Sequence, residues 1–75
     1  MEKYLLHEKA IGILNKYYER IESLIVEGNR DLALVLYHSS GDILLFMYLM
    51  EIINFTEYRV LKDSYNDFFD LVFLR

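Results

Sequence analysis

The stretch from Leu32 to Phe55 reads LALVLYHSSGDILLFMYLMEIINF and carries only two formally charged residues, Asp42 and Glu51. Charged residues are frequent on both sides of it. Moving so many apolar side chains out of water is favourable. However, a chain of 75 residues has little interior to hold them, since domains of this size bury only about 60% of the surface that the unfolded chain exposes. Either neighbouring helices or a second molecule must enclose the stretch, and this need favours a self-associating helical bundle.

The composition excludes several classes of protein. Cysteine is absent, so neither a disulfide framework nor a thiolate zinc site is available. No glycine-rich phosphate loop or dinucleotide-binding fingerprint occurs, so no cofactor is predicted. The net charge is −4, from 12 acidic and 8 basic residues. Phosphate binding needs clustered basic residues, and those of this chain are scattered, so the sequence argues against nucleic acid as a partner. The first residues lack a basic region followed by an apolar run, so no signal peptide is expected and the predicted location is cytoplasmic.

Residues 2–27 are predicted to form the first helix. Their apolar seam keeps the alternating four- and three-residue spacing of a helix: His7, Ile11, Leu14, Tyr18, Ile21 and Ile25. The helix is expected to end at Gly28 and Asn29, which both accept the left-handed backbone conformation. Asn29 or Asp31 is then available to cap the next helix.

Residues 30–54 are predicted to be helical too, and here the sequence leaves two forms open. Poor helix formers gather at 38–42, and Ser39 with Asp42 resembles a capping box, which would split the region at 39–41 and give four helices. A continuous or kinked helix would instead match the length of the first. In that form the small residues Ser40 and Gly41 would allow close approach of another backbone, and a crossing point on a symmetry axis is expected there.

The third helix is predicted at about 57–73, capped by Thr56. Apolar residues repeat at helical spacing on one side, and acids gather on the other. The fold class expected for residues 1–75 is therefore all-α: one domain, an antiparallel bundle of three helices, assembled as a dimer.

No residue set defines a catalytic, cofactor-binding or metal site, so the chain is predicted not to be an enzyme. The candidate sites are surfaces. The residues predicted to face a second copy are Ser40, Gly41, Leu44, Met47, Tyr48, Phe69 and Phe73. The acids predicted to face another protein are Glu19, Glu22, Asp63, Asp67 and Asp70. Antiparallel pairing about the first turn would bring His38 near Glu19 and Glu22, which makes His38 a candidate pH-sensitive side chain.

The function predicted from these features is a small protein–protein interaction module or regulator that acts as a homodimer. One alternative is an inhibitor, encoded by a phage or other mobile element, that occludes a host enzyme or defence complex. The other alternative is a small membrane-associated protein, because residues 32–55 are long enough to span a bilayer. Placing Asp42 in mid-membrane counts against that alternative, since one Asp there costs about 2.5 to 3.5 kcal/mol.

Overall fold

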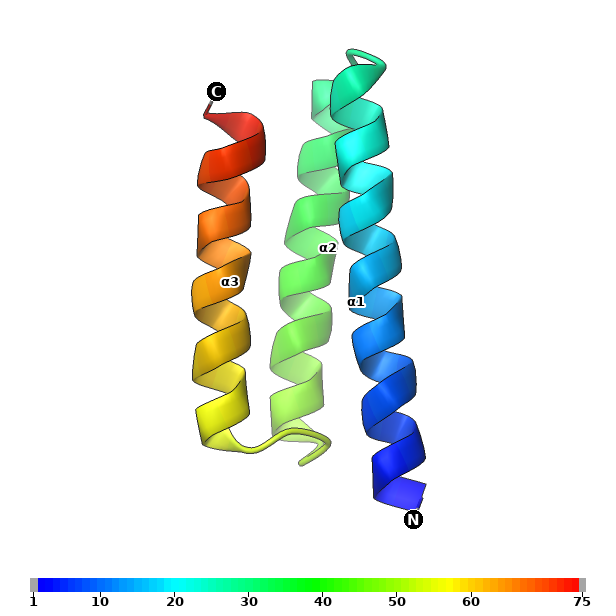
Figure 1. The fold of residues 1–75 in the computed structure, drawn as a ribbon, viewed down its shortest axis with the longest axis vertical. Helices are drawn as coiled ribbons and strands as arrows, with labels where there is room; N and C mark the ends of the chain where they lie inside the picture. Colours follow the sequence, from blue (N-terminus) through cyan, green and yellow to red (C-terminus); the bar gives the residue numbers. More distant parts are fainter. Residues whose placement is uncertain (1, 75) are drawn as a thin grey trace.

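The computed structural model describes the backbone of residues 2–74 and the side chains of residues 5–74. Three helices follow one another: α1 (Glu2–Val26), α2 (Arg30–Leu49) and α3 (Phe55–Phe73). They run antiparallel in sequence order, with α2 behind and between the other two (Figure 1). Both α1 and α3 pack along α2, and they touch each other much less. The prediction of an all-α chain with three helices is confirmed, and no strand occurs in residues 2–74.

The turn between α1 and α2 forms as predicted. Gly28 has a φ of 83°, which is the left-handed conformation that glycine adopts without a steric cost. The side chain of Asn29 then accepts a hydrogen bond from the backbone N–H of Leu32, at 3.3 Å, and so caps α2.

The helix α2 runs without a break through Ser39, Ser40 and Gly41. The hydroxyl of Ser40 donates a hydrogen bond of 2.6 Å to the backbone carbonyl of Tyr37, one turn back in the same helix. This bond satisfies a buried hydroxyl inside the helix. Among the two forms that the sequence left open, the structure therefore has the continuous one.

The helix α2 ends at Leu49, five residues before the predicted end at 54. Glu51 adopts a φ of 59°, and the N–H groups of Ile52 and Ile53 turn back to the carbonyl of Met47. This turn buries the side chain of Ile53 in the core. Sequence patterns missed it because neither glycine nor proline marks the position.

The helix α3 begins at Phe55, two residues before the predicted start, and Asn54 rather than Thr56 caps it. The Asn54 side chain accepts a hydrogen bond of 2.8 Å from the backbone N–H of Glu57. Asn is as good a capping residue as Thr or better, so the local pattern allowed either one.

The core lies where the inner sides of all three helices meet. It consists of Leu14, Ile21 and Leu24 from α1, of Ala33, Tyr37, Leu44 and Met47 from α2, of Ile53 from the second turn, and of Tyr65 and Phe73 from α3.

Candidate interaction surface

Two stacked tyrosines form the centre of the contact between α2 and α3. The rings of Tyr37 and Tyr65 lie 4.1 Å apart and are inclined by only 9°. Each hydroxyl donates to the other residue's backbone carbonyl, at 3.0 Å from Tyr37 and at 3.2 Å from Tyr65. The ammonium group of Lys62 lies 4.7 Å from the centre of the Tyr65 ring, which adds a cation–π contact. The stacked rings thus join α2 to α3, and both buried hydroxyls form hydrogen bonds.

The buried position of these phenols changes their acidity. Burial raises the pKa of Tyr37 above its ordinary value of 10.0, and the nearby Tyr65 raises it further. Burial also raises the pKa of Tyr65 and of Tyr18. The three phenols therefore stay neutral well above neutral pH, and those of Tyr37 and Tyr65 keep the hydrogen bonds that join α2 to α3.

Gly41 gives the close approach that its small size predicts, and the neighbour is Tyr65 of the same chain. A Cβ added at Gly41 would lie 2.5 Å from the Tyr65 hydroxyl oxygen and 2.8 Å from the ring carbon that carries it. The expected crossing point is thus occupied within one copy, and Gly41 serves the packing of α3 on α2.

The other residues predicted to face a second copy are buried or half-buried within one copy. Ser40, Leu44, Met47 and Phe73 are buried in one copy, so they present no surface in this fold. Tyr48 is half-buried and stacks on Tyr58 at 4.9 Å, and Phe69 stacks on Phe73 at 5.1 Å. Periodicity identified these residues as packing residues, but it does not show whether the neighbour is α3 or another molecule.

The side of α2 turned away from both neighbouring helices is apolar and exposed. Val35 and Phe46 are 58% and 57% exposed, and Leu32 and Leu49 are 42% and 66% exposed. Leu45 lies at the edge of this face and is exposed as well. These apolar side chains form two groups, one on each side of Ser39 and Asp42, and large exposed apolar patches on soluble proteins commonly mark interaction sites. We call the line formed by Leu32, Val35, Ser39, Asp42, Phe46 and Leu49 the outer seam of α2.

The five acids predicted to face a partner are all exposed: Glu19, Glu22, Asp63, Asp67 and Asp70. Glu19 and Glu22 line a shallow hollow on α1 together with Glu27. Asp70 lines another hollow, beside Tyr37 and Phe69. His38 is exposed, its ring lies 5.8 Å from that of Tyr37, and no carboxylate of the described residues lies within ion-pair distance of it.

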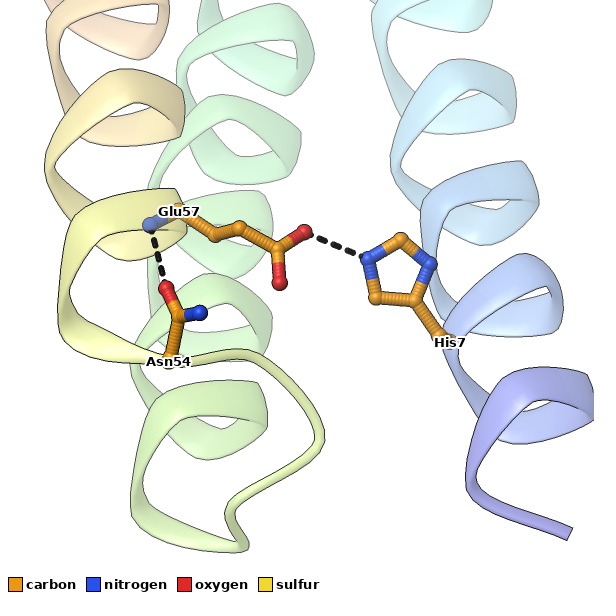
Figure 2. Close-up of polar contacts among 3 residues, drawn as sticks. All are labelled: His7, Asn54 and Glu57. Atoms are coloured by element: carbon orange, nitrogen blue, oxygen red, sulfur yellow. Dashed lines mark hydrogen bonds and ion pairs between the residues drawn. The ribbon is translucent and has the colours of Figure 1, made fainter. Parts of the chain in front are cut away.

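The histidine that does meet a carboxylate is His7. Its Nε2 lies 2.6 Å from a carboxylate oxygen of Glu57, so the pair joins α1 to the first turn of α3, as Figure 2 shows. Both side chains are partly exposed. Antiparallel pairing about the first turn relates only the first two helices, so it could not predict this contact, which forms because the turn at 50–54 returns the chain as α3 beside α1.

The described residues offer little for chemistry on a small molecule. No group of three His, Asp or Glu side chains among them could hold a metal ion. The hollows are open, and the most apolar of them is lined by Ile11, Thr56, Glu57, Val60 and Leu61. By length and composition alone, α2 could also cross a membrane, a test that the core helix of a soluble protein passes equally well.

Comparison with known proteins gives no relative from which to carry over a function. No family model matches the chain, and neither a curated protein nor a solved structure is significantly similar to it.

Proposed function

We propose that this protein is a small, non-enzymatic interaction module that acts as a homodimer. The observation that carries the proposal is the exposed apolar side of α2, opposite the side that the bundle buries. Burial of apolar surface is worth about 25 cal/mol for each Å² removed from water. A second copy would supply that burial, as the chain's own α1 and α3 do not.

The second part of the proposal is a protein partner with a basic surface. All five acids singled out above are exposed, and the chain carries a net charge of −4. Exposed charges of one sign accelerate association with a partner of opposite charge and disfavour partners of like charge. The alternative function, an inhibitor that occludes a host enzyme, would use the same acids.

The first test is the absolute mass of the untagged protein without detergent, by sedimentation across a hundredfold range of concentration. The expected result is a dimer that dissociates on dilution. A monomer at every concentration would overturn the homodimer.

The second test captures partners from a lysate and repeats the capture with Asp63, Asp67 and Asp70 replaced by Lys. A true partner is expected to be lost with the variant and at high salt, because screening weakens exposed charge pairs. Unchanged capture by the Lys variant would overturn the acidic binding surface. Loss of a captured enzyme's activity would identify the protein as an inhibitor.

A further inference from the structure

We propose that two copies pair through the outer seam of α2, with their α2 helices antiparallel. This inference rests on the proposed homodimer and names its surface and geometry. The seam residues Leu32, Val35, Ser39, Asp42, Phe46 and Leu49 follow the alternating three- and four-residue spacing of a coiled-coil seam. The apolar members are exposed on the side of α2 that faces neither α1 nor α3.

The order of side chains along the seam is symmetric. Read from either end, it starts with a Leu, continues with a large apolar residue and reaches a polar one at the centre. When two such helices lie antiparallel about a twofold axis between Ser40 and Gly41, Leu32 of one copy meets Leu49 of the other. Val35 then meets Phe46. A twofold interface requires this reciprocity, in which residue i contacts j and j contacts i.

The polar centre of the seam selects the direction of pairing. In the antiparallel arrangement each Asp42 carboxylate meets the Ser39 hydroxyl of the other copy, which can donate a hydrogen bond to it. In a parallel arrangement each Asp42 would face its own equivalent, and two carboxylates in a partly dry seam repel each other. A single polar position in an apolar seam is a known means of setting register.

The same centre favours a second copy over a lipid surface as the occupant. The hydrocarbon of a bilayer would cover Leu32, Phe46 and Leu49 equally well, but it offers no donor to the Asp42 carboxylate, which lies midway between them. A buried charge without a partner costs far more than a paired one. The Ser39 hydroxyl of a second copy supplies the missing partner.

Disulfide cross-linking tests the register directly, because the chain contains no cysteine of its own. Val35→Cys protein is mixed with Phe46→Cys protein and oxidised at a concentration where the mass shows a dimer. Antiparallel pairing predicts the mixed cross-linked dimer. Each variant alone is expected to cross-link at least tenfold less, since two Val35 positions would lie about 16 Å apart along the helices at 1.5 Å per residue, beyond the limit of about 7 Å between Cα atoms. The matched control is Val60→Cys, at an exposed position on α3.

Each outcome decides between the claims. Preferential cross-linking of the mixture supports the antiparallel seam. Cross-linking of Val35→Cys alone would show a parallel pair and overturn this inference while leaving the homodimer. A dimer by mass that gives no cross-link in the mixture would place the interface elsewhere, again leaving the homodimer. A monomer by mass would overturn both.

A second measurement does not depend on cysteine chemistry. Val35→Lys is expected to weaken dimerisation at least tenfold, and Val60→Lys, equally exposed but off the seam, by less than threefold. Circular dichroism checks that both variants stay helical. Equal effects of the two substitutions would overturn the seam. So would a wild-type protein that is monomeric and partitions onto phosphatidylcholine vesicles through Val35, since that result would make lipid the occupant.

Discussion

Replacing Gly41 by Ala tests the tightest contact of the bundle. In the middle of a solvent-facing helix this change would stabilise the protein by about 0.5 to 1 kcal/mol, because Ala loses less backbone entropy on folding. At Gly41 the new Cβ would meet the Tyr65 hydroxyl at 2.5 Å and the adjoining ring carbon at 2.8 Å. Both atoms belong to the Tyr65 side chain, whose ring stacks on that of Tyr37 and whose hydroxyl donates a hydrogen bond to the Tyr37 backbone carbonyl.

The clash should decide the sign of the effect. Overpacking a filled core costs about 1 to 3 kcal/mol, and a disturbed hydrogen bond from Tyr65 adds about 1 kcal/mol. After the gain in helix propensity is deducted, Gly41→Ala is expected to lower the free energy of unfolding by about 1 to 3.5 kcal/mol. For a chain of this size each kcal/mol shifts the melting temperature by about 4 to 8 °C.

The chain supplies its own control in Gly12, which is also helical and has no heavy atom within 4 Å of an added Cβ. Gly12→Ala should raise stability by about 0.5 to 1 kcal/mol. Urea unfolding followed by circular dichroism measures both variants at one protein concentration, because the proposed dimer would make stability depend on concentration. Adding Tyr65→Phe to Gly41→Ala should restore part of the loss, since it removes the closest atom. If Gly41→Ala stabilised the protein as Gly12→Ala does, the close contact with Tyr65 would be refuted.

Three further predictions follow from the packing. Phe73→Ala should cost about 3 to 5 kcal/mol, which approaches the whole stability of a small domain, so its thermal transition should lose cooperativity; a drop below 1 kcal/mol would contradict the buried position of this ring. Because burial raises the folded-state pKa of Tyr18, Tyr37 and Tyr65 above 10.0, the unfolded chain releases these protons first. The stability that the neutral phenols contribute is therefore fully present below about pH 10 and is lost as the pH rises above that value. The urea midpoint of unfolding, measured between about pH 9 and pH 12, should fall less steeply with pH in Tyr37→Phe than in the wild-type protein. Glu57→Gln should change stability by less than about 1 kcal/mol, because its pair with His7 is partly exposed; a larger loss would show that this link holds α1 to α3.

Structural features that depend only on residues close together in the sequence were predictable. The turn at Gly28 and Asn29 follows from the conformational freedom of the first and the capping side chain of the second. The span of α1 follows from a seam that continues without a break until that turn. The end of α2 was not predictable in this way, because Glu51 adopts a left-handed conformation that is unusual for it and that the bonds to Met47 hold in place.

Spacing along the chain was enough to predict an all-α protein, its apolar helical faces and the residues that pack, because the 3.6-residue period of a helix assigns each residue to a face from its position in the sequence. Which apolar face meets which neighbour depended on how the three helices pack. This packing places Gly41, Leu44 and Phe73 inside one copy and leaves Val35 and Phe46 outside. Periodicity could not make that distinction, because α2 is apolar on nearly all sides, whereas its contacts with α1 and α3 cover only part of its circumference.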